Sequence, residues 1–178
     1  MDIFGVRVAV LAPTGPECAA LREALLACGI AGVRVSDTPA RFFSHCLGGG
    51  TDLGVIGLGN AAASGFGALN ALRAGQGGLN RYLPIIVALA HPTAQIVHEA
   101  INCGAHEFLV LPPNVRALSN LIYRAVFISR PFILTSDYSG PCRRRRANPD
   151  YKGSERRRAP WPGYVHASHK AQGKEHVG

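Results

Sequence analysis

Short apolar runs alternate along the first 126 residues with segments whose apolar residues are spaced for a helix. Five runs are mostly aliphatic and rich in β-branched residues, which is typical of strands buried in a parallel sheet. The five predicted strands are Val6–Leu11, Val33–Ser36, Leu53–Leu58, Pro84–Leu89 and Glu107–Val110.

Helices are predicted between and after these strands. Pro16 suits a first helical position, and Cys18, Leu21 and Leu25 follow at helical spacing before Gly29 ends the segment. Thr93 and Asn114 are suited to cap two later helices. The five predicted helices begin near Pro16, Pro39, Gly65, Thr93 and Asn114.

This alternation predicts an α/β fold with a doubly wound parallel sheet and helices on both faces. In such sheets a ligand crevice lies beyond the carboxyl ends of the strands. The residues expected there are Ala12-Pro13, Gly57-Leu58, Leu89-Ala90 and Leu111-Pro112.

Charge divides the chain at about residue 130. Residues 1–130 hold nine Arg and seven acidic residues, a net charge of +2, whereas residues 131–178 hold ten Lys or Arg and four acidic residues, a net charge of +6. We therefore expect one domain over 1–130 and an arginine-rich tail over 131–178. The tail is poor in aliphatic residues, so we expect it to be extended and largely disordered without a partner. An anionic partner or a merely solubilising role would each explain its charge.

The five cysteines are scattered and form no C-x-x-C pair, which argues against a zinc site and against a disulfide framework. His91, His98 and His106 are interpreted as surface or crevice-rim residues rather than metal ligands. The sequence contains no apparent signal peptide and no apolar stretch of about 20 residues that could span a membrane. We therefore expect a cytoplasmic protein with no metal, no cofactor and no membrane partner.

Residues 6–126 resemble a receiver domain of the response-regulator family. The landmarks that carry this resemblance are Asp52–Gly57 before the third loop, Gly65 and Arg73 on the third helix, Leu83-Pro-Ile-Ile86, Ala100 with Gly104-Ala105, and Leu111-Pro112. The resemblance implies a flavodoxin-like sheet of five strands in the order 2-1-3-4-5.

The residues that perform receiver chemistry are replaced. A receiver has an acidic pair that holds Mg²⁺, a phosphoacceptor Asp, a Thr or Ser, and a Lys. The matching positions here are Ala12 and Pro13, Gly57, Leu89, and Leu111. Apolar side chains supply neither Mg²⁺ ligands nor a nucleophile. The resemblance therefore implies a pseudo-receiver that is not an enzyme, is not phosphorylated and binds no Mg²⁺. A phosphate held by the glycine loop at 57–60 is an alternative, although no phosphate-binding fingerprint is present.

A nine-residue pattern occurs twice in the tail. Asp137–Arg145 and Asp150–Arg158 both read D-Y-x-G-x-x-R-R-R, identical at six of nine positions. The candidate ligand-binding residues are Asp137, Tyr138, Gly140, Arg143, Arg144 and Arg145 in the first copy, and Asp150, Tyr151, Gly153, Arg156, Arg157 and Arg158 in the second.

Each residue type in the repeat suits a purine nucleotide. Arginine forks bind phosphate or the O6/N7 edge of guanine, and tyrosine offers a stacking surface. Glycine permits a tight bend between them. A carboxylate repels phosphate but accepts from N1–H and N2–H₂ of guanine; pairing of each Asp with its own arginines is an equal alternative.

Cyclic di-GMP carries two guanines and two phosphates related by two-fold symmetry, and the tail resembles the arginine-rich extensions of chemotaxis-regulator-like proteins that bind it. That resemblance implies a non-enzymatic signalling protein whose receiver core docks a protein partner, such as a flagellar-motor or other signalling component. The alternatives are a protein-interaction adaptor without a small ligand, and nucleic-acid binding by the basic tail.

Overall fold

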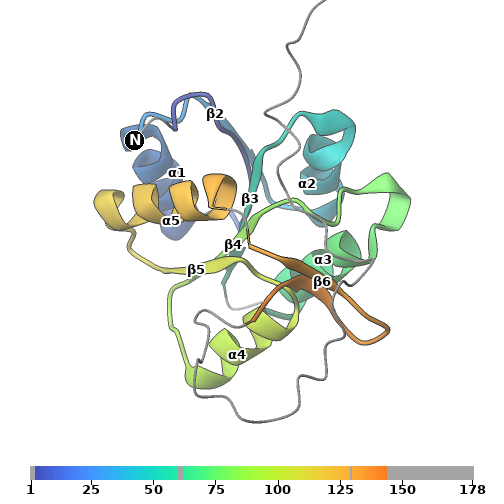
Figure 1. Ribbon diagram of the computed structural model, residues 1–178. Helices are drawn as coiled ribbons and strands as arrows, with labels where there is room; N and C mark the ends of the chain where they lie inside the picture. Colours follow the sequence, from blue (N-terminus) through green and yellow to red (C-terminus); the bar gives the residue numbers. More distant parts are fainter. Residues whose placement is uncertain (1–2, 60–61, 129, 144–178) are drawn as a thin grey trace, which may run out of the picture.

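The computed structural model describes residues 3–59, 62–128 and 130–143 (Figure 1). The first copy of the repeat is therefore described only up to Arg143. Arg144, Arg145 and the whole second copy lie outside the described residues.

A five-stranded parallel sheet in the order β2-β1-β3-β4-β5 forms the centre of the domain (Figure 1). Each predicted strand is present, and the strand order confirms the flavodoxin-like arrangement. The pairing is parallel throughout, as the crossover helices require. The strands are β1 (Arg7–Leu11), β2 (Gly32–Ser36), β3 (Leu53–Leu58), β4 (Ile85–Leu89) and β5 (Glu107–Val110).

Five helices cover the two faces of this sheet. The helices are α1 (Pro16–Ala27), α2 (Pro39–Cys46), α3 (Ala62–Ala74), α4 (Ala94–Asn102) and α5 (Val115–Phe127), with short 3₁₀ turns η1 (Leu47–Gly49) and η2 (Gln76–Gly78). The predicted caps are confirmed: Thr93 Oγ1 accepts from the Ile96 amide at 3.2 Å, and Asn114 Oδ1 accepts from the Ala117 amide at 3.1 Å.

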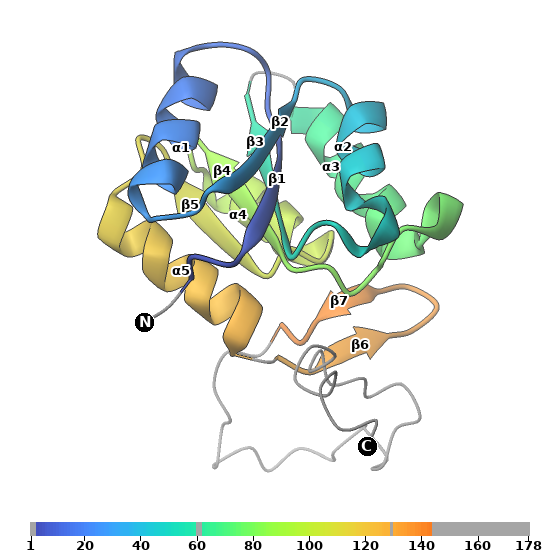
Figure 2. The same ribbon diagram turned by 90° about the horizontal axis from the view of Figure 1, so that it is seen from above.

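Two apolar cores result, one on each side of the sheet. Helices α1 and α5 lie on one face, where Leu25 and Leu118 pack against Val55. Helices α2, α3 and α4 lie on the other face, where Phe42 and Leu72 belong to the second core (Figure 2). Because both faces are covered, β3 and β4 are almost continuously apolar, as the sequence indicated.

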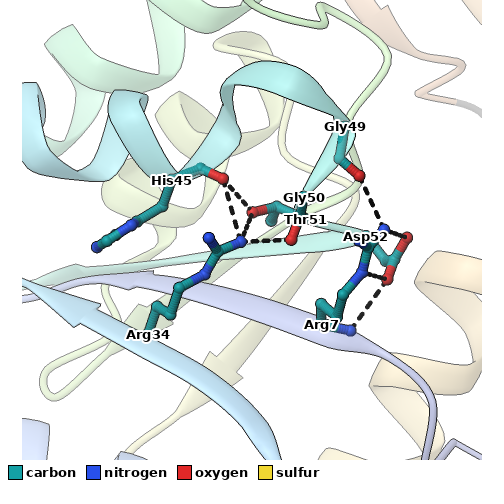
Figure 3. A network of polar contacts seen from close by, with 7 residues as sticks. All are labelled: Arg7, Arg34, His45, Gly49, Gly50, Thr51 and Asp52. Atoms are coloured by element: carbon teal, nitrogen blue, oxygen red, sulfur yellow. Dashed lines mark hydrogen bonds and ion pairs between the residues drawn. The ribbon is translucent and has the colours of Figure 1, made fainter.

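A polar network ties the amino ends of β1 and β3 to the loop after α2 (Figure 3). The Asp52 carboxylate accepts from the Arg7 amide at 3.0 Å and from the Arg7 guanidinium at 2.9 and 3.1 Å. Arg34 of β2 donates to the His45 and Gly50 carbonyls and to Thr51 Oγ1. These bonds fix where the third strand starts.

An antiparallel hairpin follows α5. It consists of β6 (Phe132–Leu134) and β7 (Ser139–Pro141) and lies at the end of the sheet where the central strands begin (Figure 2). This hairpin was not predicted from the sequence. Phe132 is buried, and its ring lies edge-on to Tyr82 with centroids 4.8 Å apart, so the segment packs onto the domain. The Asp-Tyr-x-Gly part of the first repeat belongs to this hairpin.

Candidate functional site

A cavity of about 370 Å³ lies at the carboxyl end of the sheet, where the sequence predicted the crevice. Ala12, Pro13, Gly57 and Leu111 all line it, so four of the five replaced positions meet there. Among the lining residues Glu17 is the single acidic one, and it comes from α1 rather than from a strand end. One carboxylate without a second provides a poor Mg²⁺ site.

Leu89, the fifth of these positions, and Asp52, the carboxylate next to β3, both lie outside this cavity. Leu89 is buried and belongs to the core beneath α3 and α4 rather than to the cavity wall. Asp52 starts β3 at the opposite end from Gly57, and Arg7 occupies its oxygens. Asp52 therefore cannot replace a phosphoacceptor at Gly57.

The hairpin brings Tyr138 and Arg143 of the first repeat together. The Arg143 guanidinium lies over the Tyr138 ring, 4.0 Å from its centroid, in a cation–π contact. The Tyr138 hydroxyl donates to the Pro141 carbonyl at 2.6 Å. Burial raises the pKa of Tyr138, against the opposing effect of Arg143, so the hydroxyl keeps its proton. Tyr138 and Arg143 of the first copy thus form a cation–π pair at the surface of the domain.

Gly140 and Ser139 attach this stack to the domain. A Cβ built on Gly140 would lie 2.7 Å from the Gly104 Cα, so only glycine allows this approach. Ser139 Oγ donates to the Arg73 carbonyl at 2.8 Å. We predicted that Gly140 brings tyrosine and arginine to one point; its close approach to Gly104 is a further reason for glycine there.

Asp137 lies at the turn of the hairpin and is exposed. Among the described residues its carboxylate forms no ion pair, and Arg143 stacks on Tyr138 instead. Asp137 and Tyr138 line a second cavity, of about 360 Å³, between the hairpin and the ends of α3 and α4. Asp137 is thus placed to accept hydrogen bonds from a molecule in that cavity.

Beneath the hairpin lies a buried pair, Arg73 and His106. Arg73 donates to the carbonyls of Gly104, Arg81 and Leu83, and its fourth contact is His106 Nδ1 at 3.2 Å. Burial without a carboxylate partner lowers the pKa of Arg73 to about 9. Phe132 covers the Arg73 guanidinium, whose carbon is 5.7 Å from the ring centroid.

The prediction that His106 is a surface or rim residue is wrong. The His106 side chain is buried, and Nδ1 accepts from the Ile85 amide at 3.2 Å. Burial, with Arg73 and Arg130 nearby, lowers the pKa of His106 well below its ordinary value of 6.5. The proton of the neutral ring is therefore on Nε2. Sequence spacing carried no signal for this pair, because its members are 33 residues apart.

Within residues 3–59, 62–128 and 130–143, no three His, Cys, Asp or Glu residues are grouped as a metal would require. In the same ranges, none of the helices combines the length and apolarity needed to cross a membrane. The five cysteines, all of which lie in the described part of the chain, form no disulfide bond with one another.

Solved structures with a similar arrangement include several receiver domains. A Burkholderia pseudomallei protein described as related to pilus assembly superposes with a TM-score of 0.59 at 19% identity, over 71% of this chain and 93% of its own. The Vibrio cholerae chemotaxis protein CheY4 superposes with a TM-score of 0.57 at 17% identity, over 67% of this chain and 98% of its own. This chain has the receiver-domain fold.

Another solved structure with this fold contains a magnesium ion. The receiver domain of a Pseudomonas aeruginosa sensor histidine kinase, with magnesium coordinated in its active-site cleft, superposes with a TM-score of 0.58 at 16% identity. The match covers 68% of this chain and 98% of that one. No protein-family model and no curated protein matches the sequence. The receiver fold and the local geometry are therefore the basis for assigning a function.

Proposed function

We propose that this chain is a non-enzymatic signalling protein: a pseudo-receiver that is not phosphorylated, with an arginine-rich tail that binds cyclic di-GMP. The observation that carries the proposal is the Tyr138–Arg143 stack, held against the domain next to Asp137, whose carboxylate forms no ion pair among the described residues. A stacking ring, a guanidinium fork and a carboxylate acceptor are the three groups that a guanine nucleotide uses.

The crevice supports the pseudo-receiver half of the proposal. Phosphoryl transfer needs a nucleophile and cations that neutralise the transferred charge. Gly57 has no nucleophilic atom, and Ala12 and Leu111 offer no charge to the same cavity. The signal would then enter the protein through the tail, with the receiver core docking a protein partner in a signalling assembly.

The arrangement of the hairpin supports the proposal that the tail binds cyclic di-GMP. Arg130, at its start, donates to the carbonyls of His106 and Cys142 and so closes the hairpin onto the domain. The first repeat therefore begins on a fixed base, which reduces the conformational entropy lost when the ligand binds. Arg144 and Arg145 follow Arg143 directly in the sequence and would extend the arginine surface.

Calorimetric titration of the full chain with cyclic di-GMP tests the proposal. We expect saturable binding to the wild-type chain. We expect at least a tenfold loss of affinity when Arg144→Ala and Arg157→Ala are combined, because a hydrogen bond to a charged group contributes about 1.5–3 kcal/mol. The matched control, Arg22→Ala plus Arg116→Ala, removes the same charge from exposed helical positions and should bind normally.

The competing functions predict different results in the same assay. A nucleic-acid-binding tail would bind a short RNA with affinity that falls linearly on a log scale of salt concentration, and would not prefer cyclic di-GMP to GTP. An adaptor without a small ligand would give no heat with any nucleotide. Absent binding at high micromolar cyclic di-GMP, or equal binding by both double variants, would contradict the proposal.

A further inference from the structure

A polar cavity of about 360 Å³ separates the hairpin from the carboxyl-terminal ends of α3 and α4. Small-molecule sites span roughly 300–1,000 Å³, so this cavity suits one nucleobase better than a whole cyclic dinucleotide. Its walls come from three places: Asn70, Arg73 and Ala74 of α3, Asn102 and Cys103 at the end of α4, and residues 134–139 of the hairpin, with Arg81 completing the rim.

The two arginines of the cavity differ in their availability. A guanidinium has five N–H donors. The Arg73 guanidinium makes four polar contacts, three with backbone carbonyls and one with His106 Nδ1. The Arg81 guanidinium donates a single described hydrogen bond, to the Ala74 carbonyl at 3.2 Å, and the residue is only half-buried. Arg81 is therefore the cation that can turn to a ligand, whereas Arg73 is fixed in the fold.

Acceptors and further donors line the same space. Asp137 is the one acidic residue of the lining, and it comes from the hairpin turn. The amides of Asn70 and Asn102 are exposed, and Asn102 lies within 3.1 Å of His98 on the outer side of α4. The cavity thus presents a carboxylate, a guanidinium and two amides, which together match the donors and acceptors of guanine and do not match an apolar ligand.

We propose that this cavity receives one guanine of cyclic di-GMP, with Asp137 accepting from N1–H and N2–H₂ and Arg81 donating to O6 and N7. The inference rests on the proposed function and adds that the folded domain supplies part of the ligand site. Guanine exposes these two pairs of atoms on different edges. Asp137 and Arg81 come from separate segments of the chain, so each is assigned to one of these edges.

Calorimetry on the full chain distinguishes a domain contribution from binding by the tail alone. Arg81→Ala should lower the affinity for cyclic di-GMP at least tenfold, and Arg81→Lys should fall between it and the wild-type chain, because lysine keeps the charge but loses the fork. Arg116→Ala, which removes an exposed arginine far along the sequence on α5, is the matched control and should bind as the wild-type chain does.

A ligand analogue tests the edge assigned to Asp137. Cyclic di-IMP lacks the N2 amino group, so the wild-type chain should bind it about tenfold more weakly than cyclic di-GMP, the loss expected for one charge-assisted hydrogen bond. Asp137→Asn should show a smaller preference for cyclic di-GMP over cyclic di-IMP than the wild-type chain does. In wild-type protein, cyclic di-GMP should also shift the side-chain amide resonances of Asn70 and Asn102, a readout that needs no substitution.

Three outcomes separate this inference from the function on which it rests. If the wild-type chain binds cyclic di-GMP, Arg81→Ala binds it more weakly and the asparagine amide resonances shift, then the cavity site and the proposed function are both supported. If Arg81→Ala binds cyclic di-GMP as tightly as the wild-type chain does and the amide resonances do not shift, then the cavity is not the site. Binding of cyclic di-GMP by the tail would still stand. A wild-type chain that binds no cyclic di-GMP overturns both.

Discussion

Gly140 of the hairpin and Gly104 at the end of α4 pack backbone against backbone. A Cβ on Gly140 would lie 2.7 Å from the Gly104 Cα, and a Cβ on Gly104 would lie 2.6 Å from the Ser139 carbonyl oxygen. Gly104 also has a φ of +92°, which side chains rarely adopt. The first repeat thus docks on the domain at a point where neither surface tolerates a methyl group.

Gly140→Ala should therefore loosen the hairpin without unfolding the domain. Overpacking of a close contact typically costs about 1–3 kcal/mol, and here the opposing atoms are backbone. We expect faster hydrogen exchange at the amides that pair β6 with β7, while the amides of the central sheet keep their protection. Exchange measured by NMR at neutral pH checks this.

Gly67→Ala is the matched control for that substitution. Gly67 lies on an exposed side of α3, and a Cβ there would meet no atom within 4 Å. Alanine at such a position should stabilise the chain by about 0.5–1 kcal/mol through its higher helix propensity. If Gly140→Ala leaves hairpin exchange unchanged, the Gly104 contact does not control docking.

His106 predicts a pH dependence of stability. Its pKa in the folded chain is well below 6.5, because the ring is buried beside Arg73 and Arg130. Below about pH 6.5 the unfolded chain binds a proton that the folded chain does not. The free energy of unfolding should therefore fall as pH drops from 7 towards 5, by up to about 1.4 kcal/mol per unit. Urea denaturation at several pH values measures this slope.

His106→Asn supplies the control. Asparagine offers an acceptor oxygen to the Ile85 amide but has no group that titrates in this range. The variant should be less stable at pH 7 and should lose most of the slope between pH 7 and 5. Identical slopes in the two proteins would show that His106 is not the group responsible.

The domain was predictable because its signals are local. Thr93 and Asn114 cap helices through amides three residues away, and Gly29 and Gly104 end helices at positive φ. The hairpin was missed because its strands have three residues each, and one contains Gly140-Pro141, which composition assigns to a loop. Its stability depends on contacts such as Phe132 with Tyr82, 50 residues away in sequence.

The candidate site likewise contains residues that were predictable from the sequence and residues that were not. Ala12, Gly57 and Leu111 were found because strand ends meet at one edge of a parallel sheet. The environment of His106 could not be predicted, since its burial arises when the hairpin and the end of α3 close over it. Arg81 also carried no sequence signal: a single arginine before a strand becomes informative only when Asp137 lines the same cavity.

The Arg7–Asp52 pair makes a third prediction. Asp52 accepts three hydrogen bonds from Arg7, and its side chain is 13% exposed, so Asp52→Asn should destabilise the domain by about 1–2 kcal/mol. Asp37→Asn is matched, because Asp37 forms only a long, exposed 3.8 Å contact with Arg41 and should change stability by less than about 0.5 kcal/mol. Equal effects in urea denaturation would contradict the distinction.

Restoring a phosphoacceptor alone should not restore phosphorylation. An aspartate at Gly57 would place its Cβ 3.0 Å from the Ala12 Cβ, a tight but tolerable approach. Its carboxylate would still face a cavity whose strand-end residues offer neither a second carboxylate nor a positive charge. We expect neither the wild-type chain nor Gly57→Asp to form an acyl phosphate with acetyl phosphate and Mg²⁺, as measured by intact mass.

A combined variant provides the positive comparison for that experiment. Ala12→Asp and Leu111→Lys added to Gly57→Asp supply one metal ligand and one cation at the same cavity. A mass increase of one phosphoryl group in this triple variant, absent from Gly57→Asp alone, would assign the inertness to the missing cations. Phosphorylation of the wild-type chain would contradict the pseudo-receiver assignment outright, because Gly57 provides no atom to receive the group.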